Sequence, residues 1–203
     1  RKKEIIAEFA DYRSGQLQDG RFFLFRSKAK FLDAHTLELT DEKRLQADHF
    51  ILSTGSQIAM PPISGLDQVT FKTSDDVLEL SEIPEEVVVL GGGIVACELA
   101  QFLHRVGSKV TLLQRSDRIL KDFPPQASLC VRKNFDKEGM IVKTGVSIEE
   151  LKQINEHTNR IDFLHDGKKE SLETTYLFHA LGRTPSIDGL NLQAIGVELE
   201  TSG

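Results

Sequence analysis

Cysteine is scarce in this sequence, and the placement of its two copies argues against a redox pair. Cys97 and Cys130 are the only cysteines among 203 residues, and they form neither a C-x-x-C nor a C-x-x-x-x-C pattern. We interpret both as small core residues. The six histidines, at positions 35, 49, 104, 157, 165 and 179, are scattered and show no ligand or triad spacing. The sequence therefore predicts no metal site.

Long apolar runs and basic stripes are also missing. No apolar run approaches the roughly 18 residues that a membrane-spanning helix needs, and no signal peptide is visible. The net charge is −6, and the only basic run is Arg1-Lys2-Lys3, which argues against nucleic acid as a partner. With 39% hydrophobic and 28% charged residues, the composition is typical of a folded domain, and we expect a cytoplasmic location.

A glycine-rich turn is the most informative feature that is present. The apolar run 87–90 leads directly into Gly91-Gly92-Gly93-Ile94-Val95-Ala96, which reads G-x-G-x-x-A. Gly91 permits a tight turn, Gly93 lets backbone N–H groups approach a pyrophosphate, and the small Ala96 lets the helix lie close to the strand. The N–H groups of Ile94 and Val95 would complete this phosphate site at a helix N-terminus. A glycine turn with a purely steric role is the alternative.

The flanking sequence favours dinucleotide binding over that alternative. Residues 94–106 predict a helix that Gly107 ends, and the segment 109–114 predicts a second strand. The apolar face expected for this helix consists of Val95, Leu99, Phe102, Leu103 and Val106. The strand, turn, helix and second strand fit within roughly 30 residues, as a dinucleotide fingerprint requires.

The end of the second strand indicates which dinucleotide is preferred. An NAD site usually places Asp or Glu about 20 residues after the glycines. Gln114 and Arg115 occupy this place here; the first removes a repelling carboxylate and the second suits a 2′-phosphate. Arg118 and Lys121 add positive charge, partly offset by two nearby aspartates. We therefore expect NADP(H) rather than NAD(H), the alternative being that Arg115 is an ordinary solvated loop charge.

Four motifs follow one another along the sequence. They are Leu52-Ser53-Thr54-Gly55-Ser56 with the prolines at 61 and 62, the glycine turn with Glu98, Gly107-Ser108-Lys109-Val110-Thr111 with Arg115, and Ala180-Leu181-Gly182-Arg183-Thr184-Pro185. Together they resemble the flavin-dependent pyridine nucleotide-disulfide oxidoreductases, which include glutathione reductase, dihydrolipoamide dehydrogenase and mercuric reductase. The segment around the glycine helix looks most like mercuric reductases and dihydrolipoamide dehydrogenase-like proteins. Leu181, Ser186 and Ser53 depart from the residues usual in the family.

The resemblance implies specific roles for residues in these motifs. Glu98 would approach the nicotinamide carboxamide, although a glutamate near a helix N-terminus is also stabilising in its own right. Ile94 takes the position of the side chain that lies between flavin and nicotinamide in the family. Gly182 would let the backbone approach the cofactor, and Arg183 would make either a domain-interface ion pair or a cofactor contact.

The resemblance also shows which family features the sequence does not contain. It has no second glycine fingerprint for FAD, no C-x-x-x-x-C pair and no catalytic histidine motif. We therefore expect a fragment that binds the nicotinamide nucleotide, carries no catalytic residue, does not bind FAD and is inactive alone. In the intact enzyme, expected to be a homodimer, hydride would pass from the nicotinamide to FAD and then to a cysteine pair. A stand-alone nicotinamide-binding regulatory domain and a small dehydrogenase are the alternatives; the latter lacks a Tyr-x-x-x-Lys pattern.

The predicted fold is α/β, with a Rossmann-like parallel sheet, an antiparallel β-meander and an N-terminal β-rich piece of a flavin domain. The expected domains are 1–57 for that piece, 58–183 for the NAD(P)-binding domain and 184–203 for a return segment. In the first, we expect a helix over 4–13 and strands over 22–31, 36–40 and 45–52. In the second, we expect a capped helix after Thr73, a helix over 126–138, a strand over 140–143, a meander over 147–174 and a last strand over 176–181.

Overall fold

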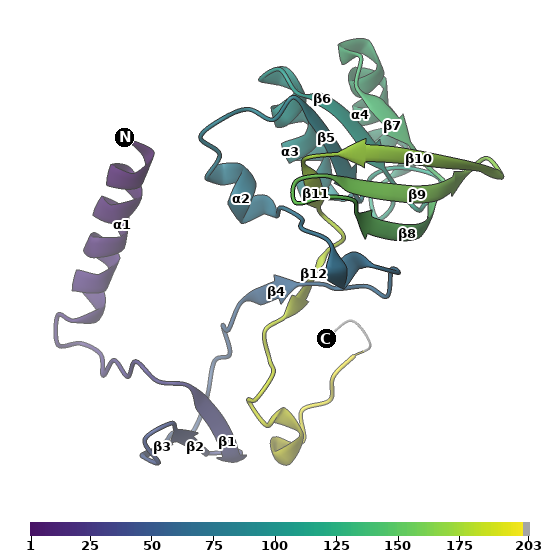
Figure 1. Cartoon of the computed structure of the whole chain (residues 1–203). Coiled ribbons are helices and arrows are strands. Elements are labelled where there is room, and N and C mark those ends of the chain that lie inside the picture. The colour runs from purple at the N-terminus through teal and green to yellow at the C-terminus, as the bar shows by residue number, and fades with distance from the viewer. Residues whose placement is uncertain (201–203) are drawn as a thin grey trace. The chain divides into compact units, whose positions relative to one another are not determined.

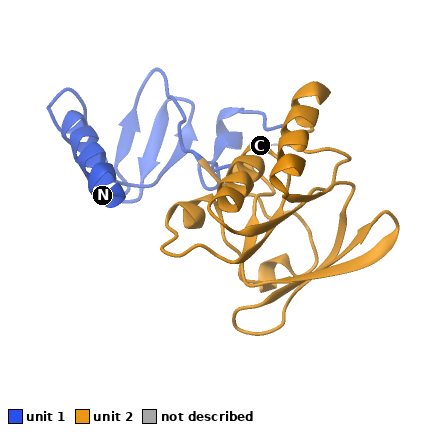
Figure 2. Ribbon diagram, turned by 90° about the horizontal axis from the view of Figure 1, so that it is seen from above, with its two compact units in different colours: residues 1–55, 185–203 blue, residues 56–184 orange. Residues whose placement is uncertain are grey.

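The computed structural model describes residues 1–200 and has a mixed α/β architecture. The chain divides into two compact units, one formed by residues 1–55 with the segment from 185 onward, the other by residues 56–184 (Figure 2). The parallel and antiparallel sheets of the larger unit confirm the predicted fold class.

A four-stranded parallel sheet forms the centre of the larger unit (Figure 1), with strand order β11-β5-β6-β7. Its strands are β5 (Glu86–Leu90), β6 (Lys109–Leu113), β7 (Ile141–Lys143) and β11 (Leu177–His179). Side chains of β5 alternate between two separate cores: Val87 and Val89 face one, Val88 and Leu90 the other. A strand buried on both faces needs an uninterrupted apolar run, which explains the sequence of this segment.

Helices α3 (Ile94–Arg105) and α4 (Pro125–Glu138) contribute to the core on one face of this sheet, and both were predicted. The predicted apolar face of α3 was wrong in part. Its buried residues are Ala96, Cys97, Ala100 and Leu103, whereas the side chains of Val95, Phe102 and Val106 are exposed. The small alanines let the helix backbone approach the strands closely, so the largest apolar side chains do not mark the buried face.

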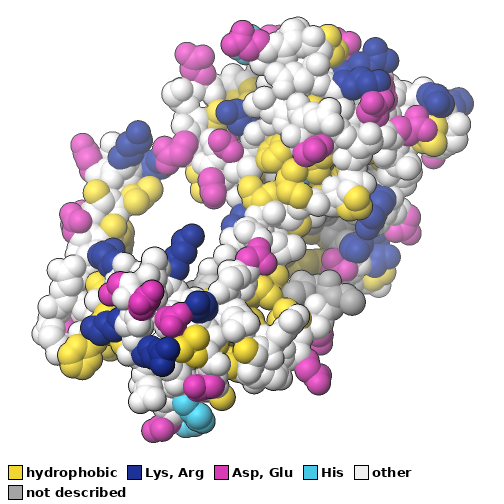
Figure 3. Space-filling view, turned by 60° about the horizontal axis from the view of Figure 1, so that its bottom comes forward, with side chains coloured by type: hydrophobic (Ala, Val, Ile, Leu, Met, Phe, Trp, Pro, Cys, Tyr) yellow, Lys and Arg dark blue, Asp and Glu magenta, His cyan; other side chains and the backbone are white. Residues whose placement is uncertain are grey.

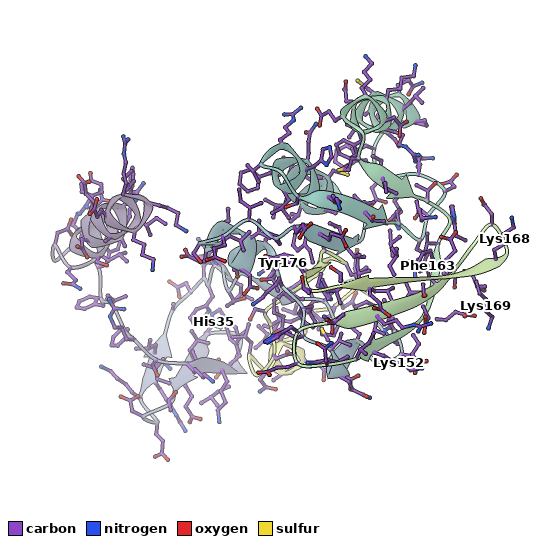
Figure 4. The ribbon with its side chains drawn as sticks, turned by 45° about the horizontal axis from the view of Figure 1, so that its top comes forward. His35, Lys152, Phe163, Lys168, Lys169 and Tyr176 are labelled. Carbon is purple, nitrogen blue, oxygen red and sulfur yellow. The ribbon has the colours of Figure 1, made fainter. Side chains whose placement is uncertain are left out.

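An antiparallel meander contributes to the core on the other face, as predicted. Its strands are β8 (Ser147–Gln153), β9 (Asn159–His165) and β10 (Lys168–Thr174). Asp166 and Gly167 both have positive φ angles, as a two-residue hairpin turn requires. Figure 4 shows Phe163 on this meander and the side chains of Lys168 and Lys169 extending from the hairpin tip. The larger unit therefore has three layers: helices, parallel sheet and meander.

Short elements complete the larger unit. They are β4 (Ser56–Ile58), the 3₁₀ helix η1 (Leu66–Gln68), α2 (Ser74–Leu78) and β12 (Arg183–Pro185), whose final residue is assigned to the other unit. The predicted cap of α2 is confirmed: Thr73 and Asp76 form a reciprocal capping box. Strands β4 and β12 pair with each other.

The smaller unit contains α1 (Lys2–Leu17), a sheet of β1 (Ala29–Asp33), β2 (Thr36–Leu39) and β3 (Arg44–Gln46), and the 3₁₀ helix η2 (Leu192–Ile195). Two strand predictions were too long. Residues 22–28 and 47–52 are not in strands, because the observed ladders pair only residues 29–33, 36–39 and 44–46. The Phe31 N–H donates to the Leu190 carbonyl at 2.9 Å, which joins the returning segment to β1.

Apolar side chains of the smaller unit remain exposed. No residue of α1 is buried, Phe23 is 94% exposed, and Ile51 is 92% exposed. On the face drawn in Figure 3, hydrophobic side chains also reach the surface, and cationic and anionic side chains are interspersed. Exposed apolar side chains of this unit therefore lie on α1 as well as in segments where the predicted strands are not formed.

The two cysteines differ in environment. Cys97 is buried, as predicted, but Cys130 is exposed on α4, so its assignment to the core was wrong. Its helix presents only Ser128 and Phe135 as buried residues. Among residues 1–200, no helix is long and apolar enough to cross a membrane. The same residues contain no cluster of three or more His, Cys, Asp or Glu side chains arranged to hold a metal ion.

Candidate dinucleotide site

A cavity of about 650 Å³ lies at the carboxyl edge of the parallel sheet. This volume is within the range of small-molecule and cofactor sites. All of its lining residues belong to the larger unit. They come from the glycine turn and the start of α3, the loop after β6, the start of β8, the start of α2, and two segments around residues 58–63 and 179–183. Ligands of open α/β sheets bind at this edge of the sheet.

Gly91 lies at the tightest point of the turn, against the segment that follows β11. Its φ angle is +112°, and a Cβ atom here would overlap the carbonyl oxygen of Ala180 and lie 2.9 Å from its carbonyl carbon. The Gly91 N–H donates to the Leu113 carbonyl at 2.9 Å. The turn is therefore held between β6 and the segment after β11, and only glycine fits.

Gly92 and Gly93 differ in what surrounds them. A Cβ on Gly92 would lie 3.0 Å from the side chain of Gln114, which is buried beside the turn and lines the cavity. A Cβ on Gly93 would meet no atom within 4 Å, and Gly93 has an ordinary φ of −78°. Gly93 therefore needs to be glycine neither for its backbone conformation nor for protein packing.

The N-terminus of α3 opens into this cavity with unpaired donors. The first helical bond runs from the Cys97 N–H to the Gly93 carbonyl at 3.0 Å. The N–H groups of Ile94, Val95 and Ala96 therefore have no carbonyl partner within the helix. No side chain caps this end, and no acidic residue lies in its first turn. Donors and helix dipole together make a site for an anion.

The loop after β6 gives one end of the cavity a positive charge. Arg115, Ser116, Lys121 and Asp122 line it there. Three of the four charged side chains that line the whole cavity are cationic, since Arg183 lines its other end. Arg118 does not line the cavity; its Nη2 donates to the Lys121 carbonyl at 2.7 Å and braces the loop.

The same loop folds back onto the glycine turn. The Leu120 N–H donates to the Gly92 carbonyl at 2.6 Å, and Leu120 has a φ of +50°. The cationic end of the cavity is thereby joined to the turn by a backbone hydrogen bond. Arg115 itself is exposed at the rim.

The other end of the cavity lies beside β11. Ile94 and Val95 are about half exposed and line the cavity, as does Gly182, whose φ is +114°. Arg183 donates through Nε and Nη2 to the hydroxyl and carbonyl of Ser56, each at 2.7 Å. The described contacts of Arg183 are therefore hydrogen bonds within the larger unit, and, because Arg183 also lines the cavity, the predicted cofactor contact stays a prediction.

Glu98 is the one candidate residue that the structure does not bring to the cavity. It is exposed on α3 and does not line the cavity wall, whereas the other eight candidates do: Gly91, Gly92, Gly93, Ile94, Val95, Gln114, Arg115 and Gly182. Its charge contributes, after burial, to the high pKa of the neighbouring Cys97 thiol, about 12. This thiol is therefore protonated and unreactive at neutral pH.

Sequence reasoning missed His179, which lines the cavity and is only 4% exposed. Neither ring nitrogen has a hydrogen-bond partner, and the ring lies 4.8 Å from that of Phe71. Desolvation lowers the pKa of His179 and outweighs the opposite effect of nearby carbonyls of its own residue and Ala59. Its position in the predicted strand 176–181, immediately before Ala180-Leu181-Gly182, was the available signal.

The fold and this cavity define an α/β protein with a glycine-rich turn at the carboxyl edge of a parallel sheet. The profile of the pyridine nucleotide-disulphide oxidoreductase family matches residues 3–203, and the chain belongs to this family. Its members are flavin-dependent oxidoreductases that use pyridine nucleotides.

Curated relatives support this assignment. The chain is 37% identical over 198 residues to a mercuric reductase of Lysinibacillus sphaericus, covering 97% of this chain and 36% of that protein. It is 26% identical over 207 residues to a dihydrolipoyl dehydrogenase of Bacillus subtilis, covering 100% of this chain and 44% of that protein. The chain thus spans less than half the length of these two relatives.

A solved structure shows the same fold. The flavoprotein disulfide reductase RclA of Escherichia coli, in its Cu(II) complex, superposes with a TM-score of 0.85 at 22% sequence identity. The match covers 100% of this chain and 46% of that one.

Proposed function

We propose that the cavity of the larger unit binds a nicotinamide dinucleotide, and that the chain supplies this binding step to a flavin-dependent disulfide oxidoreductase. The observation that carries the proposal is the open N-terminus of α3, where Gly93 faces the cavity and three N–H groups lack helical partners. Gly91, Gly92, Ile94 and Val95 would surround the pyrophosphate together with Gly93.

We propose NADP(H) as the preferred nucleotide. Gln114 at the end of β6 places a neutral amide where an NAD site has a carboxylate, and it lines the cavity. Arg115, Ser116 and Lys121 line the same end, so cationic groups and a hydroxyl surround the expected position of a 2′-phosphate. Asp122 offsets part of this charge.

The part of the chain that the structure describes does not fit FAD. In residues 1–55 and 185–200, no glycine-rich turn leads from a strand into an α-helix, the feature that cradles the pyrophosphate in the larger unit. We therefore propose that other residues of an intact enzyme hold the flavin, which would accept the hydride as the nicotinamide is oxidised. This chain's residues would bind and orient the nicotinamide, and Gly182 would allow close backbone approach.

Several finer assignments are also proposals. The smaller unit would belong to a flavin domain, with residues 1–57 and 184–203 on either side of the nicotinamide domain, and the isolated chain would be inactive. The intact enzyme would be a cytoplasmic homodimer whose electron acceptor is a disulfide or a metal ion, as the names of the relatives suggest. Glu98 would contact the nicotinamide carboxamide only where the bound nicotinamide extends past the residues that line the cavity.

Isothermal titration calorimetry of the chain with NADPH and NADH tests the proposal. We expect saturable binding of one nucleotide per chain, with NADPH the tighter ligand. Absence of heat with both nucleotides, at a protein concentration where circular dichroism shows a folded chain, would refute dinucleotide binding. Equal affinities would refute the proposed preference and leave the binding proposal intact.

A further inference from the structure

His179 is unusual among the histidines of the larger unit because it is buried without a hydrogen bond. His104, for comparison, faces the Ser108 carbonyl at 3.2 Å and the Glu138 carbonyl at 2.8 Å through its two ring nitrogens. Neither nitrogen of His179 has such a partner, although only 4% of the residue is exposed to solvent. Burying an unsatisfied polar group costs free energy, so such a group calls for a functional explanation.

The position of His179 in the sheet relates it to the bound nucleotide. Gln114 follows β6, and the residue at this place contacts the adenosine ribose in dinucleotide sites. The pyrophosphate would lie at the glycine turn after β5, which is the next strand in the sheet. β11 lies on the other side of β5, so the nicotinamide half would extend toward the end of β11, where His179 is the last residue.

The surroundings of the ring match a ligand with both donors and acceptors. His179 lies on the meander side of the sheet, where its ring contacts Phe71, and where Ile63 and Ile148 line the cavity. These side chains offer the imidazole no hydrogen bond, and the nearby backbone carbonyls of His179 and Ala59, which partly offset the lowering of its pKa, do not reach hydrogen-bond geometry with either ring nitrogen. Because desolvation lowers its pKa, the ring is neutral at neutral pH and carries one donor and one acceptor nitrogen. The carboxamide and ribose hydroxyls of a nicotinamide nucleoside offer the complementary groups.

We propose that His179 is a binding residue for the nicotinamide half of the dinucleotide, with a ring nitrogen turning into the cavity to hydrogen-bond the carboxamide or the adjacent ribose. This inference rests on the proposed function of the cavity. In the free chain the imidazole lowers stability, and in the complex it gains the partner that it lacks. The residue thereby favours the complete dinucleotide over its adenosine half.

The test compares His179→Phe with His104→Phe, a matched control outside the cavity. Calorimetry measures the affinity of each protein for two ligands. The first is whichever of NADPH and NADH binds more tightly, and the second is the adenosine half of that nucleotide, 2′,5′-ADP for NADPH or 5′-ADP for NADH. For His179→Phe we expect the affinity for the dinucleotide to fall at least tenfold and the affinity for the adenosine half to stay within twofold. Its melting temperature should be no lower than that of the unsubstituted chain. For His104→Phe we expect a lower melting temperature and unchanged affinities, because the ring's polar contact with backbone carbonyls is lost at a place away from the cavity.

The outcomes distinguish this inference from the proposal on which it depends. If the unsubstituted chain binds neither ligand, the dinucleotide proposal fails and the role of His179 fails with it. If the chain binds both ligands but His179→Phe leaves both affinities unchanged, or weakens both equally, only the role of His179 is overturned.

Should His179→Phe fail to fold, the unsubstituted chain labelled with ¹⁵N-histidine gives a second measurement. The dinucleotide should shift the ring nitrogen resonances of His179, while the adenosine half should leave them in place. Unmoved resonances at saturation with the dinucleotide would also overturn the proposal.

Discussion

Gly91 lies against the carbonyl group of Ala180, so close that a methyl group on Gly91 would overlap the Ala180 oxygen. The contact joins the turn after β5 to the segment after β11, the two neighbouring strands of the sheet. Two features of the cavity therefore depend on one backbone contact: the pyrophosphate turn and the proposed nicotinamide end. The contact is between backbone and backbone, so no side-chain movement can relieve an added atom.

Gly91→Ala should destabilise the fold. The substitution adds the overlap with Ala180 and forces a non-glycine residue to adopt a φ of +112°. We expect a loss of more than about 2 kcal/mol in the free energy of unfolding, measured by urea denaturation. An unchanged urea midpoint would contradict the packing described here.

Gly93→Ala is the matched control for that substitution and should separate binding from stability. A Cβ at Gly93 meets no protein atom and needs no unusual backbone angle. We expect a change of no more than about 1 kcal/mol in unfolding free energy. NADPH affinity should fall at least tenfold, or about 1.4 kcal/mol, because the methyl group occupies the approach of the pyrophosphate. Affinity retained by Gly93→Ala would mean that the nucleotide does not reach this backbone.

Arg115→Ala should narrow the difference in affinity between NADPH and NADH. The guanidinium lines the end of the cavity where Gln114 replaces a carboxylate, so its removal should weaken NADPH selectively. Arg132→Ala is a suitable control because Arg132 pairs with Asp136 on α4 and does not line the cavity. Both variants change net charge equally. Equal losses of NADPH affinity in the two variants would indicate a general charge effect instead.

The two cysteines should react at very different rates with iodoacetamide at pH 8. Burial and the charge of Glu98 raise the pKa of Cys97 to about 12, so the reactive thiolate is scarce, whereas Cys130 is exposed. Peptide mass spectrometry should find Cys130 modified first in the folded chain, and Cys97 modified only after unfolding. Prompt labelling of Cys97 under native conditions would contradict its buried position.

Glu170 should make stability depend on acidic pH. Hydrogen bonds from Lys143, at 2.7 Å, and from His165, at 3.1 Å, hold its pKa below the ordinary value of 4.5. A carboxyl group with a lowered folded-state pKa stabilises the fold above its unfolded pKa, and this contribution disappears as pH falls through the folded value. Glu170→Gln should therefore lower the urea midpoint at pH 7 more than at pH 3. A difference independent of pH would contradict the assigned contacts.

The sequence predicted the larger unit well because its elements carry strong local signals. The apolar run of β5, the glycine after α4 and the Thr73 cap each have a structural counterpart. The buried face of α3 was not predictable from apolar periodicity alone. Close packing against the sheet selects the small Ala96 and Ala100, and it leaves the large Phe102 outside.

The smaller unit was predicted less well for a different physical reason. Strands form only where a partner supplies a hydrogen-bonded ladder, and residues such as Phe23 and Ile51 have strand-like composition but no ladder in the described structure. The candidate site shows a similar limit. Motifs located the glycine turn, whereas His179 only precedes a motif, and its importance depends on burial and on missing partners that only the structure shows.

The most direct test of the central claim is a ¹H–¹⁵N NMR titration of the chain with NADPH. The account predicts that the largest amide shifts fall on Gly93, Ile94 and Val95, whose N–H groups would receive the pyrophosphate, with further shifts near Arg115 and Gly182. Saturable shifts elsewhere that leave these three amides unmoved would contradict binding at the N-terminus of α3. So would the absence of any amide shift in a folded chain at millimolar NADPH.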